Sequence, residues 1–244
     1  MNFNVSEYWN NRLGENFSLK GVGHISFSRF YNTWLYKTKL FVLNKIKNEK
    51  KIILAQKKVL DIGSGTGFFV EYYTQKKAKI TGLDITDISI LYLSKKYPQS
   101  KFYTLDISNA MIEEKFDIIN MWDVIYHQVD ENLFLQTLTN ISKMLKPGSF
   151  FICTDTFGGN QVKQVNEHVV FRPMANYAGI MDKLGFKLIK IYPLYRWMNR
   201  PYPWGTRVTN ILAPFLFLLD VLNKKVEKNN LSVAVWIFQS EQDL

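Results

Sequence analysis

The chain has 244 residues, of which 47% are hydrophobic, 15% aromatic and 21% charged. This balance is typical of a folded globular protein and excludes intrinsic disorder, collagen-like repeats and low-complexity sequence. The single cysteine, Cys153, excludes an internal disulfide and a cysteine-only metal site. The sequence shows neither a secretory leader nor an apolar run of the roughly 20 residues that span a bilayer, so we expect one cytoplasmic domain with appendages.

The formal net charge is +10, from 31 Lys and Arg residues against 21 Asp and Glu residues. Such a charge permits a nucleic acid, an anionic lipid or an acidic metabolite as partner. Only 6 of the 31 cations are arginines, and the lysines are scattered through segments with helical patterns, such as 45–51 and 94–98. We therefore expect solvated lysine faces rather than a stripe that binds nucleic acid.

The first regular element expected is an amphipathic helix over 33–49, where Tyr36, Leu40, Leu43 and Ile46 recur at helical spacing. From residue 58 onward, short apolar runs alternate with helical patterns. The predicted strands are 58–62, 79–84, 101–106, 116–121, 149–155, 186–194 and 231–239. The predicted helices between them are 68–77, 88–97, 133–145 and 173–184. This alternation predicts an α/β fold with a doubly wound, mostly parallel sheet of seven strands covered by helices.

The element order divides the chain into three parts. Residues 1–57 are expected to form an N-terminal cap or lid, and residues 58–194 with 231–244 a Rossmann-like domain. Residues 195–230 form an aromatic and basic insertion before the last strand. A polar loop is expected over 156–168.

The first predicted strand runs into the glycine-rich sequence GSGTG, Gly63 to Gly67. In a doubly wound sheet, this turn binds a ligand against a helix N-terminus. A dinucleotide fingerprint is excluded because its third glycine position holds Phe68, and a triphosphate loop because no Lys-Ser or Lys-Thr pair follows. Gly63, Gly65 and Gly67 therefore predict a cofactor loop of another kind, the alternative being that they serve only a tight turn.

Acidic residues stand at the ends of three successive strands. Asp61 precedes the glycine loop, where its carboxylate would repel phosphates and favour a cationic ligand group. Asp84 would accept hydrogen bonds from both hydroxyls of a ribose, and Asp106 would accept one from an adenine amine. Ile85 and Ile107 would sandwich the ring. The pattern describes adenosine joined to an amino acid, unless the acids only cap helices or stabilise the loop.

These residues belong to five sequence blocks, which follow one another between residues 58 and 155. The blocks are VLDIGSGTGFF, GLDIT, TLDIS, FDIINMWDVIYHQVD and MLKPGSFFICTD. In these blocks the chain resembles the class I S-adenosylmethionine-dependent methyltransferases of the small-molecule type. The resemblance implies S-adenosylmethionine as methyl donor, S-adenosylhomocysteine as product, an antiparallel last strand beside the sixth strand, and Trp122 as part of the donor pocket.

The resemblance also indicates which residues lie near the site of methyl transfer. His127 follows the fourth strand, at a family position beside the active-site mouth, and is either a general base or part of the pocket wall. His24 lies in a glycine-containing loop that would fold over the donor as a lid, or stay exposed. Tyr8, Trp9 and Arg12 resemble a segment that closes on the methionine end of the donor. Arg12 would pair with the donor carboxylate or lie at the surface.

Choice of acceptor is expected to reside in residues 171–230. Within them, 192–207 concentrates five aromatic residues and three of the six arginines. These would line a pocket for an apolar or aromatic acceptor and cap its acceptor side, or pack as a helical cap on the sheet. The apolar segment 208–228 is too short to span a bilayer, so it is either a buried cap helix or a helix in a membrane interface.

The sequence thus predicts methyl transfer from S-adenosylmethionine to a small, largely apolar or aromatic acceptor, at oxygen. One alternative is an RNA methyltransferase, which the net charge favours, although WDVI stands where an NPPY-like motif would follow the fourth strand. Another is a catalytically silent S-adenosylmethionine-binding protein. We expect no metal, no nucleic acid and no obligate protein partner, with peripheral membrane contact left open.

Overall fold

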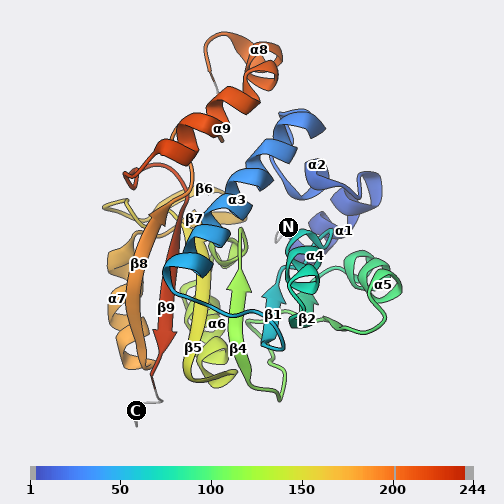
Figure 1. Ribbon diagram of the computed structural model, residues 1–244, viewed down its shortest axis with the longest axis vertical. Helices are drawn as coiled ribbons and strands as arrows, with labels where there is room; N and C mark the ends of the chain where they lie inside the picture. The colour runs from blue at the N-terminus through green and yellow to red at the C-terminus, as the bar shows by residue number, and fades with distance from the viewer. Residues whose placement is uncertain (1–3, 201, 240–244) are drawn as a thin grey trace.

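The computed structural model describes residues 4–200 and 202–239, and its centre is a seven-stranded sheet with helices on both faces (Figure 1). The strands lie in the order β3-β2-β1-β4-β5-β9-β8. Their bounds are β1 (Lys58–Ile62), β2 (Lys79–Asp84), β3 (Lys101–Thr104), β4 (Phe116–Met121), β5 (Leu145–Asp155), β8 (Phe186–Pro193) and β9 (Ser232–Phe238). The predicted α/β fold with a mostly parallel sheet of seven strands is confirmed.

The strands are buried on both sides because alternate side chains enter two separate cores. In β1, Val59 enters the core under α3 and α4, while Leu60 enters the core under α6 and α7. The helices of the first face are α3 (Arg29–Glu49), α4 (Phe68–Gln75) and α5 (Asp87–Lys96), and those of the second are α6 (Glu131–Lys143) and α7 (Met174–Lys183). Two covered faces explain why the strands read as continuous apolar runs.

The last strand, β9, is antiparallel to both of its neighbours. It lies between β5 and β8, with Cys153 of β5 opposite Ala234 and Ile191 of β8 opposite the same residue. The antiparallel last strand that the family resemblance implied is therefore present. Cys153 is fully buried in this sheet and is free, which fits a core residue rather than a nucleophile.

Several details of the predicted elements differ from the structure. The strand β5 begins at Leu145 instead of residue 149, because α6 ends at Lys143. The loop expected over 156–168 contains a strand of a small hairpin, in which β6 (Lys163–Asn166) pairs with β7 (Val169–Phe171). Strands of four and three residues leave too few alternations for a sequence pattern to reveal them. The third strand ends at Thr104 rather than residue 106, which leaves Leu105 and Asp106 in the turn beyond the sheet edge.

The N-terminal part packs as three helices against one end of the sheet. α1 (Val5–Glu15) contacts α5, and the Ser6 hydroxyl donates to the carbonyl oxygen of Ile85 at 3.0 Å. α2 (Leu19–Val22) leads to the long helix α3, which crosses the first face of the sheet (Figure 1). The predicted amphipathic helix is thus confirmed, with its start four residues earlier than expected.

The insertion before β9 contains α8 (Gly205–Ile211) and α9 (Ala213–Leu222), which lie along α3 in Figure 1. Leu216 is buried, and Phe217 packs against Trp34 of α3 with ring centroids 5.2 Å apart. No single helix in the described parts of the chain has the length and apolar character of a membrane span. Only α8 and α9 together reach that length, and they are bent by 66°.

Candidate functional site

A cavity of about 760 Å³ opens at the carboxyl ends of β1, β2 and β4. Neighbouring strands lead away in opposite directions from the space between β1 and β4, and this switch point is where doubly wound sheets bind ligands. All lining residues lie between Asn4 and Leu133, in the cap helices, the first three strand ends and the segment after β4. The cavity is therefore built by the N-terminal half of the chain.

The glycine loop forms one wall of the cavity through Gly63 and Gly65. Gly63 has φ +75°, and a Cβ there would lie 2.2 Å from Cγ2 of Val124. Gly67 has φ +83° and is the N-cap of α4, but it does not line the cavity. Glycine is required at both positions because the backbone is left-handed and close to neighbouring side chains.

Asp84 ties the glycine loop to the end of β2. Its Oδ2 accepts from the backbone N–H of Gly65 at 2.7 Å, and its Oδ1 accepts from Thr86 N and Oγ1 at 3.0 and 2.6 Å. Burial raises the pKa of this carboxyl group, and these bonds, together with the backbone N–H of Ile85, oppose that rise. Since a carboxylate has about four acceptor sites, the protein leaves room for about one more donor. Asp84 lines the cavity, and these hydrogen bonds fix the position of its carboxylate there.

Asp106 and two isoleucines form the neighbouring wall. The Oδ1 atom of Asp106 accepts from Ser108 N and Oγ at 2.9 and 2.7 Å, which fixes the carboxylate at the cavity edge. Ile85 and Ile107 both line the cavity, as does Trp122, whose ring is 4% exposed. These predicted positions are therefore brought together in one space.

Asp61 lies beneath the loop instead of lining the cavity. Its Oδ1 accepts from Asn120 Nδ2 at 2.6 Å, and its Oδ2 is buried without a hydrogen-bond partner among the described residues. Burial raises the pKa of Asp61 to about 7, and the nearby charge of Asp84 adds to this rise. A buried carboxylate with an unsatisfied oxygen is costly, so Asp61 is suited to a cationic partner that residues 4–200 and 202–239 do not supply.

His127 lies in the short 3-10 helix η1 (Ile125–His127) and lines the cavity. Its Nδ1 is 2.8 Å from the carbonyl oxygen of His168, so Nδ1 carries the proton and Nε2 is the acceptor. The ring also contacts Trp9, with centroids 5.4 Å apart. Enclosure lowers the pKa of His127 to about 4. A neutral imidazole with so low a pKa is a weak base at pH 7, which favours a wall role.

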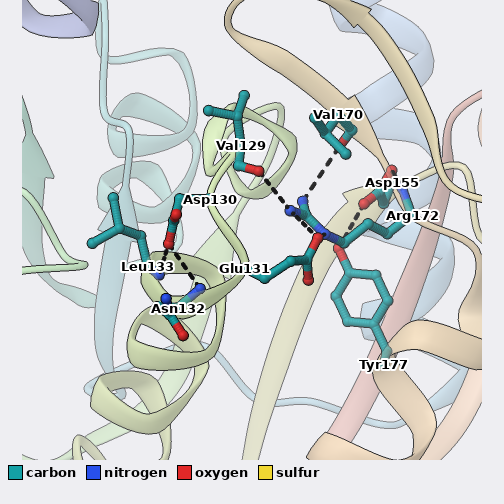
Figure 2. Close-up of polar contacts among 9 residues, drawn as sticks. All are labelled: Val129, Asp130, Glu131, Asn132, Leu133, Asp155, Val170, Arg172 and Tyr177. Carbon is teal, nitrogen blue, oxygen red and sulfur yellow. Dashed lines mark hydrogen bonds and ion pairs between the residues drawn. The ribbon is translucent and has the colours of Figure 1, made fainter.

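The segment after η1 is held by a buried arginine (Figure 2). Arg172 is fully buried, and its Nε and Nη2 atoms donate to Oε1 of Glu131 at 3.0 and 2.9 Å. Its backbone N–H donates to Asp155, whose other carboxylate oxygen accepts from the Tyr177 hydroxyl at 2.6 Å. Because Nη2 also approaches the carbonyl oxygen of Val129 at 3.4 Å, this network positions residues that line the cavity.

Three predicted cap residues lie beside the cavity rather than in its lining. Arg12 donates to the Tyr8 hydroxyl at 3.1 Å and to the carbonyl oxygen of Gly23, so it joins α1 to the turn after α2. His24 packs against Phe27, and burial followed by the charge of Arg12 lowers its pKa. Trp9 lines the cavity, whereas Tyr8, Arg12 and His24 do not. Their roles at a bound donor stay predictions.

The predicted aromatic wall over 192–207 does not line the cavity. Tyr192 and Tyr195 are buried, with their hydroxyls on Glu49 Oε2 at 2.9 Å and on the Leu35 carbonyl oxygen at 3.2 Å. The segment therefore packs on the outside of α3, as a helical cap would. Of the two interpretations of these aromatics, the helical cap fits their packing, and an acceptor-side role for the segment stays a prediction.

Sequence reasoning missed the one cationic side chain among the described residues that line the cavity, Lys39. It forms an ion pair with Asp123, and both side chains line the cavity. A signal was present, because Lys39 lies three residues after Tyr36 on the buried stripe of the predicted helix. No group of three His, Cys, Asp or Glu side chains in the described ranges is placed to hold a metal ion.

Comparison with known proteins places this geometry in a family. A family model described as a methyltransferase domain matches residues 35–191. The ubiquinone biosynthesis O-methyltransferase of Nitrobacter winogradskyi is 32% identical over 99 residues, which are 39% of this chain and 37% of that protein. The chain spans about two fifths of the length of the curated relatives it matches.

Solved structures share the fold over nearly the whole chain. The N-methyltransferase NodS from Bradyrhizobium japonicum, in complex with S-adenosylhomocysteine, has a TM-score of 0.64 at 14% identity and covers 97% of this chain and 99% of its own. Magnesium protoporphyrin IX methyltransferase from Synechocystis, with bound S-adenosylhomocysteine, has a TM-score of 0.63 at 13% identity, with coverage of 97% and 98%. At these identities the likeness concerns the fold.

Proposed function

The chain belongs to the methyltransferase-domain family, and on that premise we propose that it transfers a methyl group from S-adenosylmethionine to a small, largely apolar or aromatic acceptor. The observation that carries this proposal is the cavity at the β1–β4 switch point, where the glycine loop, Asp84 and Asp106 meet. Relatives named as O-methyltransferases support oxygen as the methylated atom.

The residues present fit this donor. Asp84 has room for one further donor at the end of β2, which suits a ribose hydroxyl. Asp106, Ile85 and Ile107 offer an acceptor and two apolar surfaces, which suit an adenine ring. The unsatisfied Oδ2 of Asp61, directly beneath the loop, suits the charge of an amino-acid ammonium group nearby.

The donor brings an activated methyl group, so the protein mainly has to bind and align both reactants in a dry space. The cavity walls do this with apolar side chains, among them Leu13, Val22 and Phe69. We propose that α1 and α2 act as a lid, because they cover the cavity and belong to the N-terminal part alone. His127 would then shape the wall rather than remove a proton.

Binding of S-adenosylhomocysteine, measured by calorimetry, tests the donor half of the proposal. We expect saturable binding with one site, and competition by S-adenosylmethionine. Absence of binding at millimolar ligand would contradict the proposal. Retention of binding with no methyl transfer to any acceptor would instead identify a catalytically silent binding protein.

We further propose peripheral contact with an anionic membrane through α8 and α9. Their outer face exposes apolar side chains, with Ile211 75%, Phe215 56% and Leu222 68% exposed, next to the exposed Lys224 and Lys225. An apolar helix face flanked by cations is typical of helices that lie in a membrane interface. The opposite face packs on α3 through Leu216 and Phe217. The segment can therefore be a cap helix on α3 and contact a membrane at the same time.

Flotation with liposomes that contain phosphatidylglycerol tests this contact. Since Phe217 is packed against Trp34, the outer face is best altered by Phe215→Asp with Leu218→Asp. We expect salt-sensitive flotation of the wild type and its loss in this variant, with the circular dichroism spectrum unchanged. No flotation of the wild type at low salt would remove the proposal.

A further inference from the structure

A largely buried ion pair lines the same cavity as the residues assigned to the donor. Lys39 of α3 is 4% exposed, and its ammonium group bonds to Oδ2 of Asp123, which follows β4. Burial lowers the pKa of Lys39, but the Asp123 and Tyr36 charges and hydrogen bonds outweigh it, and the net change is upward. Lys39 therefore stays charged within the cavity wall.

Asp123 is held in an uncommon conformation. Its φ is +60°, in the left-handed region that non-glycine residues seldom adopt. Its backbone N–H donates to Thr154 Oγ1 at 2.7 Å, and the same hydroxyl donates to Asp123 Oδ1 at 3.2 Å. Strained residues that are fixed by such contacts cluster at functional sites. A buried ion pair is also a poor means of stabilising a fold, so another role is expected for it.

Aromatic rings continue from this pair along the cavity wall. Tyr36 contacts Phe68 with ring centroids 4.6 Å apart, Phe68 contacts Phe69 at 5.4 Å, and Phe69 contacts Trp122 at 5.1 Å. All four residues line the cavity. The wall thus offers one charged pair at the end of a row of rings.

We propose that Lys39 and Asp123 together bind the hydroxyl group of an aromatic acceptor, a phenol, whose ring lies against this aromatic row. A hydroxyl both donates and accepts a hydrogen bond. The Asp123 carboxylate accepts from it, while the Lys39 ammonium, with one of its three N–H donors left by Asp123 and Tyr36, donates to its oxygen. This proposal rests on the proposed function and specifies a phenol as the acceptor.

With a phenol bound at this pair, each bond that forms or breaks during methyl transfer can be stated. The phenol O–H bond, which the hydrogen bond to Asp123 orients, breaks and its proton leaves to solvent, while an O–C bond forms to the methyl group. The C–S bond of the sulfonium breaks, and its electron pair stays on sulfur. The positive charge of Lys39 stabilises the negative charge that develops on the oxygen.

Two matched probes test the assignment, 4-methylphenol, which stays un-ionised at neutral pH, and its methyl ether 4-methylanisole, titrated by calorimetry into the protein saturated with S-adenosylhomocysteine. They differ in the hydroxyl that the pair would bind. We expect the wild type to bind the phenol about 10- to 100-fold more tightly, the usual weight of hydrogen bonds to charged groups. Equal binding of the two probes, or binding of neither, would overturn the proposal without reference to any variant.

The variant Lys39→Met with Asp123→Asn removes both charges together, so that no unpaired ion is left buried, and asparagine tolerates a left-handed backbone. We expect it to bind both probes equally while it still binds S-adenosylhomocysteine. If this variant does not fold, Asp123→Asn alone replaces it. The control Lys37→Met changes an exposed lysine of the same helix and should keep the preference.

The outcomes distinguish the role of the Lys39–Asp123 pair from the proposed function. A preference for the phenol that persists in the folded double variant would refute the role of the pair. Failure of the wild type to bind S-adenosylhomocysteine would refute the proposed function itself.

Discussion

The variant Asp84→Asn gives a quantitative test of the donor site. Asp84 already accepts three hydrogen bonds, from Gly65 N and from Thr86 N and Oγ1, and so has capacity for about one bond to the donor. Loss of one charge-assisted bond costs about 1.5–3 kcal/mol, which weakens binding roughly 10- to 150-fold. The amide would also turn an N–H group toward the Gly65 N–H or the ribose, so no compensation is expected.

The assay is calorimetric titration with S-adenosylhomocysteine, together with thermal unfolding to verify the fold. The control Asp87→Asn changes an exposed carboxylate three residues away and should alter binding by less than about 0.5 kcal/mol. Unchanged affinity in folded Asp84→Asn would refute the ribose assignment. An equal loss of affinity in both variants would show that removal of a negative charge weakens binding wherever it occurs, and not through loss of the Asp84 carboxylate in particular.

The remaining predictions concern protonation, the pocket wall and metal. Burial raises the pKa of Asp61 from 3.8 to about 7, so the folded chain holds this proton more tightly than the unfolded chain. The stability that this proton contributes is complete below the unfolded pKa and is lost as the pH rises to about 7. The free energy of unfolding of Asp61→Asn, measured with denaturant relative to that of the wild type, should therefore rise by roughly 4 kcal/mol between acidic pH and pH 8. A difference that does not change with pH would contradict this prediction. His127→Ala should raise the donor Kd and leave kcat within about tenfold, whereas a fall of about 10² to 10⁴ at unchanged Kd would make His127 the base. Methyl transfer should persist in excess chelator, and a loss that Mg²⁺ restores would reveal a metal site.

The parallel part of the sheet was predictable because its strands alternate with helical patterns, whereas the antiparallel β9 was predictable only from the family resemblance. The glycine loop and the acids Asp84 and Asp106 were predictable as well, since carboxyl ends of parallel strands meet at one edge. The position of Asp61 beneath the loop was not, because the direction of a side chain at a strand end depends on register with Asn120 of β4.

The Lys39–Asp123 pair was not predictable, because its partners are 84 residues apart and meet only when α3 packs across the face of the sheet. The same packing explains why the aromatic wall over 192–207 does not line the cavity. A sequence pattern shows that residues 192–207 are apolar and basic, but not which side of α3 they occupy. Long-range packing between helices is the information that local periodicity lacks.

Incubation with methyl-labelled S-adenosylmethionine and a panel of phenols, carboxylic acids, quinols and bulk RNA tests the central claim most directly. The account predicts label in an extractable phenolic or quinol product, formed in step with S-adenosylhomocysteine. Label in RNA alone, or no label in any acceptor while the donor binds, would contradict it.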